Sequence, residues 1–275
     1  MKRISNNALA GRICQGQDSD LLGFPKSEFV QSLERGLAVI RAFSESNPSR
    51  TLSEVAQAVG MTRAAARRFL LTLQALGYVA SDGRYFRLCP KTLELGYAYL
   101  ASLPWWRHAQ QVVGRLAGDL KQACAVGVLD RDLVAYVAYA SAAPQPVVVR
   151  PPGTRLPATP TAIGRVLLSG LPEAELDAYL TRVALSPLTP FTQMSSRKLK
   201  AAVALARQKG YSTVDQELEV ALRSIGVPVL SRSGSVAAAM SVSVRDPHLT
   251  VRDIEHNFLA PLRRASKEIT DSLPI

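Results

Sequence analysis

The chain has 275 residues, of which 47% are hydrophobic and 20% are charged. This length is too great for one ordinary small domain and suits two, and the apolar content excludes a globally disordered chain. No stretch approaches eighteen uninterrupted apolar residues, and the polar N-terminus lacks the apolar run of a secretory signal. We therefore expect a soluble, cytoplasmic protein without a membrane partner.

Basic side chains outnumber acidic ones by 33 to 22, which gives a formal net charge of +11. Such a surplus indicates a polyanionic partner, although many basic proteins bind nothing charged. The surplus is concentrated in residues 61–91, where one acid, Asp82, accompanies Arg63, Arg67, Arg68, Arg84, Arg87 and Lys91. This segment is a candidate basic patch.

Cysteine and histidine are too few and too scattered to build a disulfide framework or a metal site. The three cysteines form no CxxC pair, which fits a reducing compartment (Cys14, Cys89 and Cys124). None of the three histidines lies four residues from another. We expect neither a metal nor a redox cofactor.

The N-terminal third begins with residues 1–24, which have no apolar periodicity and are expected to form a disordered tail. Asn47-Pro48-Ser49 ends a first helix, predicted from an apolar stripe at Phe29, Leu33, Leu37, Ile40 and Phe43. A short second helix is predicted for TLSEVAQAVG. Thr51 and Glu54 have the spacing of a capping box there, and Gly60 suits the helix end.

A third helix, MTRAAARRFLLTLQALG, follows at once with Thr62 as its predicted N-cap. Its buried face is predicted to hold Ala66, Phe69, Leu70, Leu73 and Leu76. Two short helices joined by a tight turn, the second one basic at its start, are typical of a helix-turn-helix. The alternative is an ordinary helical hairpin with a solvated basic face.

The segment GYVASDGRYFRL favours DNA binding over that alternative. It predicts two short strands, at about 78–80 and 84–88, around a turn that contains Asp82-Gly83. A hairpin directly after the basic helix can act as a wing against the sugar-phosphate backbone. Small residues would let the helix start approach base edges, while arginines reach guanine or phosphate. The predicted DNA-binding residues are Thr62, Arg63, Ala64, Ala65, Arg67, Arg68, Arg84 and Arg87.

These segments resemble the IclR family of bacterial transcription regulators. The resemblance begins in FVQSLERGLAVIRAF, continues through the helix-turn-helix and KTLELGYAYL, and resumes in PGTRLPATPTAIGRVLLSGL, DQELEVALRSIGVPVL and VAAAMSVSV. The amino-acid sequence of these segments is most similar to the branch of the family that regulates protocatechuate and 4-hydroxybenzoate catabolism. The resemblance implies an α+β protein: a winged helix-turn-helix over 25–90, a linker helix over 91–105 and a GAF-like (profilin-like) effector domain over 106–275.

The remainder of the chain alternates predicted strands and helices, as expected for a domain with a central sheet. Helices are predicted over 104–120, 162–168, 172–180, 196–209 and 250–273. Strands are predicted over 125–129, 133–140, 147–150, 212–214, 222–229 and 236–244.

Two of these strands indicate a small-molecule pocket. Ser241 and Ser243 share one face of an otherwise apolar strand, and a few polar groups on an apolar wall are typical of a ligand site. Alternatively, each serine bonds a neighbouring backbone carbonyl.

The resemblance to the IclR family implies further pocket residues. Positions that line the effector pocket in relatives are matched here by Asp215, Ser224, Ser241 and Ser243, and the stretch 158–164, which includes Ala162, matches the helix start that closes it. An aromatic acid would also need a cation to bind its carboxylate. The candidates are Arg150, Arg155, Arg165 and Arg223, of which Arg150 is included among the predicted effector-binding residues. Arg223 would point away from Ser224 on the same strand.

Catalytic motifs are missing from the sequence, since it contains no GxSxG, P-loop, HExxH or GxGxxG after a strand. Asp215, Glu217 and Glu219 alternate and would share one face of a strand, most simply as a solvated edge. We expect a non-enzymatic, nucleoid-associated regulator that binds palindromic operator DNA and a small aromatic or dicarboxylic acid as a homodimer or homotetramer. The alternative within the family is an IclR-type regulator of an unrelated catabolic operon. The rivals from other classes are an enzyme with an accessory helix-turn-helix, and a DNA-binding module whose second domain only assembles oligomers.

Overall fold

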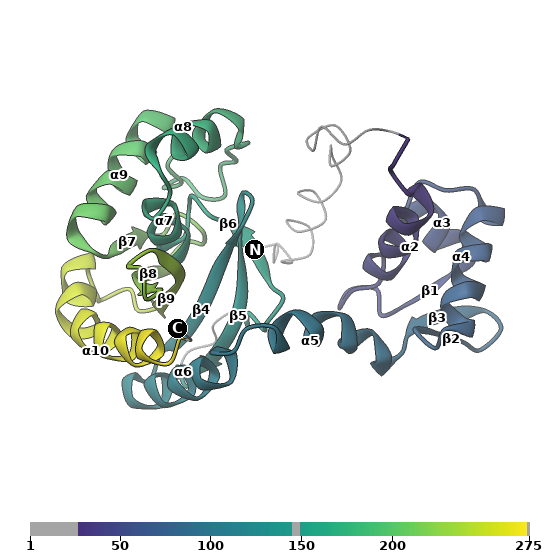
Figure 1. The fold of residues 1–275 in the computed structure, drawn as a ribbon, viewed down its shortest axis with the longest axis horizontal. Coiled ribbons are helices and arrows are strands. Elements are labelled where there is room, and N and C mark those ends of the chain that lie inside the picture. Colours follow the sequence, from purple (N-terminus) through teal and green to yellow (C-terminus); the bar gives the residue numbers. More distant parts are fainter. Residues whose placement is uncertain (1–26, 145–148, 274–275) are drawn as a thin grey trace. The chain divides into compact units, whose positions relative to one another are not determined.

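The computed structural model describes residues 27–144 and 149–273, and the chain divides into two units between Tyr99 and Leu100 (Figure 1). The tail expected over residues 1–24 lies outside the described residues. The two units are described separately below.

Three helices build most of the N-terminal unit: α2 (Gln31–Arg41), α3 (Leu52–Ala58) and α4 (Arg63–Ala75). The predicted capping box at α3 is confirmed. The Thr51 hydroxyl accepts the Glu54 N–H, and the Glu54 carboxylate accepts the Thr51 N–H at 2.7 Å. This backbone hydrogen bond also lowers the pKa of Glu54. The predicted N-cap of α4 is confirmed as well, since the Thr62 hydroxyl accepts the Ala65 N–H at 3.2 Å.

A small antiparallel sheet completes this unit, with the strand order β1-β3-β2. Its strands are β1 (Ser49–Thr51), β2 (Val79–Ser81) and β3 (Tyr85–Leu88), so the predicted hairpin starts one residue later in each strand than expected. Gly83 takes a φ of +99°, and the Asp82 carboxylate accepts the N–H groups of Arg84 and Tyr85 at 2.9 and 2.7 Å. Strand β1 was not predicted, because three residues before a helix show no alternation.

The core of the N-terminal unit is small and consists of Val39, Phe43, Val55, Leu70, Leu73 and Val79. The prediction that Leu76 is buried was wrong, since 53% of its surface is exposed. Leu76 is the C-cap of α4, and the chain turns away at Gly77 with a φ of +81°. No helical turn therefore follows to cover its side chain.

A short 3-10 helix, η1 (Pro90–Thr92), leads into α5 (Leu93–Ala101) in the region predicted as the linker helix. Leu93 and Tyr97 of this helix are both exposed. The division between the units falls within α5.

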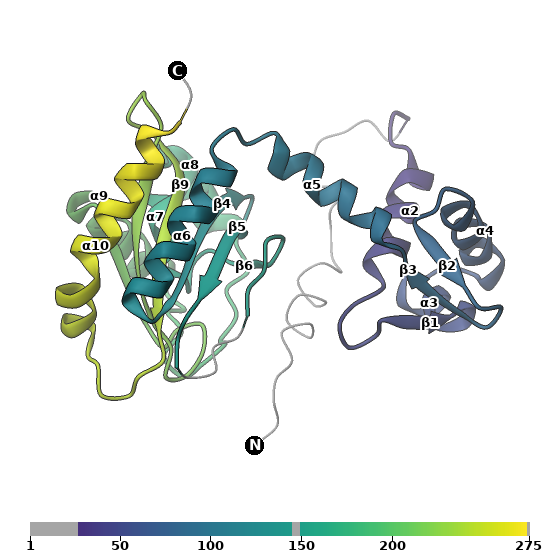
Figure 2. The same cartoon turned by 90° about the horizontal axis from the view of Figure 1, so that it is seen from below.

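The C-terminal unit is built on a six-stranded antiparallel sheet with the order β6-β5-β4-β9-β8-β7. The strands are β4 (Ala123–Asp130), β5 (Leu133–Ser141), β6 (Arg155–Pro157), β7 (Ser212–Asp215), β8 (Arg223–Leu230) and β9 (Val236–Val244). Helices α6 (Trp106–Leu120) and α10 (Val251–Asp271) pack side by side on one face (Figure 2). Helix α7 (Ala162–Ser169) packs on the other face, and α8 (Glu173–Arg182) and α9 (Ser196–Lys209) lie outside it. The central strands are nearly continuously apolar because both faces of the sheet are covered.

One predicted strand in this unit was wrong at the residues that the structure describes. Residues 147–148 of the predicted strand 147–150 lie outside the described residues, and Val149 and Arg150 are not in a strand. The edge strand is β6 instead, where Pro157 is tolerated because an edge position needs no N–H for a further neighbour. The chain also leaves β7 at Gln216, whose φ is +58°, so Glu217 and Glu219 lie in a turn.

The start of α7 makes two close backbone approaches that require glycine, one to the sheet and one to the loop before the helix. A Cβ on Gly226 of β8 would lie 3.0 Å from the carbonyl carbon of Ala162, and one on Gly164 would lie 2.0 Å from the oxygen of Ala158 in that loop. Real side chains essentially never pack at the second distance, so the missing side chains let the helix start pack against β8 and against its own preceding loop.

Replacing Gly164 by Ala is expected to lower the free energy of unfolding by about 2–3 kcal/mol, because the methyl group overlaps the Ala158 backbone. Urea denaturation followed by circular dichroism measures this change. The control is Gly114→Ala within α6, where an added Cβ meets nothing within 4 Å. That variant is expected to keep its stability or gain up to about 1 kcal/mol. Equal stability of the two variants would contradict the close approach.

Candidate functional site

The basic start of α4 and the β2–β3 hairpin lie on either side of a concave surface in the N-terminal unit. Its empty volume is about 1090 Å³, and Arg63 and Arg67 of α4 and Arg84 of the hairpin line it together with Thr51, Ser53 and Gln74. Within the described residues, no carboxylate forms an ion pair with these three arginines. The surface therefore carries a positive charge that no ion pair of its own unit offsets.

The remaining predicted DNA-binding residues surround this surface without lining it. Thr62, Ala64 and Arg68 are exposed on α4, and Ala65 is half-buried. Arg87 is exposed, but neighbouring residues of a strand point to opposite faces, so its side chain lies on the other face of β3 from Phe86, which lines the concave surface.

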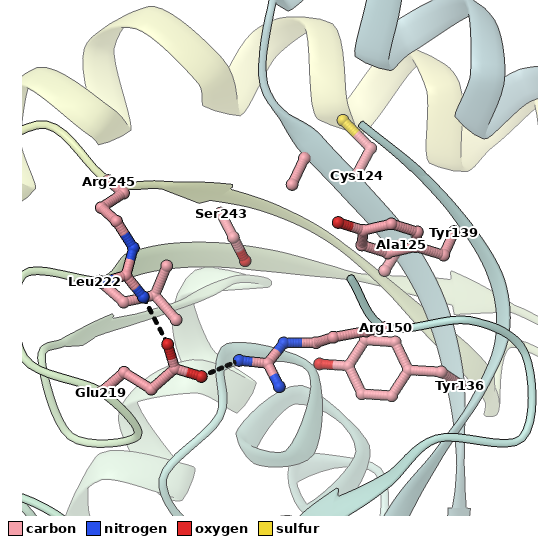
Figure 3. Close-up of a pocket in the computed structure, with 10 residues that line it drawn as sticks. Cys124, Ala125, Tyr136, Tyr139, Arg150, Glu219, Leu222, Ser243 and Arg245 are labelled. Carbon is pink, nitrogen blue, oxygen red and sulfur yellow. Dashed lines mark hydrogen bonds and ion pairs between the residues drawn. The ribbon is translucent and has the colours of Figure 1, made fainter. Parts of the chain in front are cut away.

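A second hollow lies in the C-terminal unit between the sheet and the start of α7. It has two adjoining parts with empty volumes of about 330 and 350 Å³, which share Tyr136, Arg150, Leu222 and Ser243 (Figure 3). Both parts are narrow, because the lining side chains fill most of the space between the strands and the helix.

Three serines form the polar part of the sheet wall. The strand register confirms that Ser241 and Ser243 share a face, since Ser243 pairs with Ser224 and Ser241 with Gly226. The Ser224 and Ser243 hydroxyls bond each other at 3.1 Å, so the alternative in which each bonds a neighbouring carbonyl does not hold for this pair. All three serines line the hollow.

The start of α7 forms the facing wall. Thr161 caps the helix by accepting the Gly164 N–H at 3.0 Å, and Ala162, which is 1% exposed, lines the hollow. The N–H groups of Ala162 and Ile163 have no acceptor among the described residues. A helix start with unpaired N–H groups attracts an anion.

Of the four arginines considered from the sequence, Arg150 is the one that reaches this hollow. Arg165 is paired with Glu217 through two contacts of 2.6 and 2.7 Å, Arg223 with Asp215 at 2.8 Å, and Arg155 with Asp130. Arg150 is 7% exposed and forms an ion pair with Glu219, and its Nη1 atom is buried without a hydrogen-bond partner in the part of the chain that the structure describes.

Asp215 is not brought into the hollow. It is exposed at the end of β7 and is not among the lining residues. Sequence reasoning did not select several of the lining residues, among them the polar residues Tyr136, Glu219 and Arg245. Glu219 belongs to the alternating acids noted in the sequence, whereas no local pattern marks the other two.

Burial controls the protonation of the remaining polar groups here. It raises the pKa of the Tyr136 phenol, an effect that Arg150 opposes and Glu219 reinforces. It also raises the pKa of Cys124 to about 12, so this thiol stays protonated. Figure 3 shows the Cys124 Sγ pointing away from the hollow, into the core beneath α6 and α10. Tyr136 is thus a hydrogen-bond donor, and Cys124 contributes only its backbone to the hollow.

Two further features concern the described residues alone. No group of three His, Cys, Asp or Glu side chains lies close enough together to hold a metal ion. None of the helices within 27–144 and 149–273 has the length and apolar character needed to cross a membrane.

Comparison with known proteins covers both units. The IclR helix-turn-helix domain model matches residues 32–83, and the model for the bacterial transcriptional regulator IclR C-terminal domain matches residues 97–271. The chain is 39% identical to the Pca regulon regulatory protein of Pseudomonas putida, over 90% of this chain and 85% of that protein. It is 30% identical to the p-hydroxybenzoate hydroxylase transcriptional activator of Acinetobacter baylyi, over 88% and 91%.

Solved structures agree with this assignment. A protein from Rhodococcus sp. RHA1 has a TM-score of 0.80 and 43% identity, covering 89% of this chain and 98% of its own. An IclR homolog from Microbacterium hydrocarbonoxydans, crystallised with 4-hydroxybenzoate, shares the fold with a TM-score of 0.75 at 20% identity, over 88% and 98%. With a winged helix-turn-helix, an α/β domain and family matches over both, the chain belongs to the IclR family of bacterial transcriptional regulators.

Proposed function

We propose that the protein regulates transcription of genes for aromatic-acid catabolism, and that a small carboxylate bound in the C-terminal hollow controls its binding to operator DNA. The observation that carries this proposal is the pairing of two surfaces in one chain: a concave basic surface and a hollow with buried cationic donors. Relatives named for the Pca regulon and for p-hydroxybenzoate hydroxylase support the pathway.

The N-terminal surface suits duplex DNA. Ala64 is small and exposed at the start of α4, so the helix backbone can approach base edges in a major groove. Arg63 and Arg67 extend from the same helix to guanine or phosphate, and Arg84 reaches the backbone from the wing. Thr62, Ala65, Arg68 and Arg87 complete the proposed interface.

The C-terminal hollow suits an organic acid. Its carboxylate would be held by Arg150 and the N–H groups at Ala162, while a hydroxyl group would bond Ser224, Ser241 or Ser243. Asp215, paired with Arg223 outside the hollow, has no direct part in this proposal. Effector binding would favour one arrangement of the DNA-binding units over another, through a coupling free energy.

Operator recognition would require a homodimer or homotetramer, because a single recognition helix covers too few base pairs. Apolar side chains are exposed on and beside α2 and α5, with exposed fractions between 39% and 76%: Phe29, Val30, Leu33, Leu37, Leu93, Leu95, Tyr97 and Tyr99. Exposed apolar surface of this extent favours association with a second copy.

The two rival functions are less well supported. An enzyme would need an activated nucleophile or base, but the Ser224 and Ser243 hydroxyls bond each other and the Cys124 thiol is protonated. A domain that only assembles oligomers would have no use for a buried arginine with an unpaired donor. We therefore propose a non-enzymatic regulator that resides in the cytoplasm.

Replacing Arg67 by Ala is expected to weaken operator binding by about 1–3 kcal/mol, since a base or phosphate contact is lost. Fluorescence anisotropy with a duplex selected from random sequences by the wild-type protein measures the affinity. Arg197→Ala, which removes an exposed arginine of α9, is the control and should bind like the wild type. Unchanged affinity in both Arg67→Ala and Arg63→Ala would remove this helix face from the recognition role.

An effector is expected to raise the melting temperature, because it binds the folded state alone; at 100 times its Kd the gain is about 2.7 kcal/mol. The panel is 4-hydroxybenzoate, protocatechuate and β-ketoadipate, measured by differential scanning fluorimetry. Arg150→Gln should abolish the shift, while Arg155→Gln, which alters an exposed arginine paired with Asp130, should retain it. If no acid in the panel shifts the wild type, the proposed effector class is wrong.

Replacing Leu33 by Glu is expected to reduce self-association, because a charge would be placed in the exposed apolar surface of α2. Sedimentation velocity measures the oligomeric state, and operator affinity should fall with it. Leu205→Glu is the control, since Leu205 is an exposed leucine of α9 (48%, against 63% for Leu33), and it should leave both unchanged. A Leu33→Glu protein that keeps the wild-type sedimentation coefficient would contradict the proposed interface.

A further inference from the structure

Glu219 lies between two arginines at the edge of the C-terminal hollow (Figure 3). Its Oε1 pairs with Nη2 of Arg150, which precedes β6, and its Oε2 pairs with Nη2 of Arg245, which follows β9. The exposed side-chain fractions are 23% for Glu219, 9% for Arg150 and 29% for Arg245. One carboxylate is therefore shared between two largely buried guanidinium groups.

This cluster has one positive charge in excess, unlike its neighbours. Glu217 and Asp215 each have an arginine of their own, Arg165 and Arg223. The surplus is accompanied by missing hydrogen bonds, because Arg150 Nη1 and Arg245 Nε are buried without a partner among the described residues. A buried charged donor without an acceptor is unfavourable, so these two donors can gain an acceptor from an incoming carboxylate.

We propose that Arg150 and Arg245 form the subsite for the effector's carboxylate, and that Glu219 is an internal carboxylate which occupies this subsite when no effector is bound. This inference rests on the proposed function of the hollow as the effector site. A carboxylate ligand and the Glu219 side chain present the same pair of oxygens to a guanidinium group. The effector therefore competes with Glu219 for the arginines.

The loop that carries Glu219 is anchored at Glu217, whereas the Glu219 carboxylate itself contacts the two arginines. The Glu217 carboxylate bonds Arg165 and the Gln193 N–H, and the Thr192 hydroxyl donates to the Glu217 carbonyl at 2.7 Å. By contrast, the hydrogen bonds and ion pairs of the Glu219 carboxylate within the described residues are those to Arg150 and Arg245. Glu219 can consequently leave the arginines without breaking the anchor at Glu217.

Two left-handed residues bracket this part of the loop, Gln216 with a φ of +58° and Ala221 with a φ of +63°. This conformation is unfavourable for residues other than glycine, so the loop turns sharply at both sites. The Gln216 N–H donates to the Leu222 carbonyl at 2.8 Å and closes the base of the loop. Val220, next to Glu219, is 54% exposed. The displaced segment would thus move into solvent and not into the core.

Isothermal titration calorimetry of the full chain tests the competition with Glu219→Gln, a variant of equal size without the charge. Removal of the competing anion is expected to tighten binding of 4-hydroxybenzoate, protocatechuate or adipate by about tenfold or more. Binding of 4-hydroxybenzamide, which carries no charge, should not change. Glu175→Gln, an exposed acid on α8, is the matched control and should behave like the wild type.

The second variant is Arg245→Gln, which should weaken binding of the acids by about tenfold or more while leaving the amide unaffected. It tests the subsite even if Glu219→Gln fails to fold. If the acids bind Glu219→Gln with wild-type or lower affinity, the inference about Glu219 is overturned, while the proposed effector class stands. If neither the wild type nor Glu219→Gln binds any of the acids, both the proposed effector class and the inference fail.

Discussion

The contact between the start of α7 and strand β8 determines the C-terminal hollow. Gly226 lacks the side chain that would hold the helix away, so the first turn of α7 lies against the strand that carries Ser224. This places unpaired helix N–H groups opposite hydroxyl groups across a narrow space. A wider separation would fill with water and weaken every polar contact inside it.

The buried Arg165–Glu217 pair secures this arrangement from the side. Arg165 belongs to α7, while Glu217 lies in the turn after β7, so their two contacts join the helix to the loop that carries Glu219. Buried ion pairs seldom add much net stability, because removing both charges from water is costly. Here Arg165 also donates from Nε to the Thr159 carbonyl, and the Glu217 carboxylate also accepts the Gln193 N–H. These additional hydrogen bonds favour a role of the pair in fixing one geometry of the loop.

The sequence predicted those features that depend on neighbouring residues. The capping box at Thr51 follows from its three-residue spacing to Glu54, and the cap at Thr62 follows from a threonine at the start of a helical apolar pattern. Helix α9 and strand β9 have the bounds that their patterns predict. Edge strand β6 was missed because Pro-rich sequence near an edge shows no alternation. In the hollow, the serines followed from strand alternation, whereas Arg245 and Glu219 meet Arg150 only through the sheet topology, across 95 and 69 residues of sequence.

The two functional surfaces also differ in how far apart along the sequence their residues lie. The basic residues around the concave N-terminal surface come from one helix and the following hairpin, so a single local fold presents them. The hollow instead collects its charged groups from three distant segments, and each of them must be in place for one carboxylate to lie between two arginines. Replacing that carboxylate by another at Arg150 and Arg245 leaves the net charge of the cluster unchanged. The free energy available to move the loop therefore comes from the effector's apolar contacts and from donors that gain an acceptor.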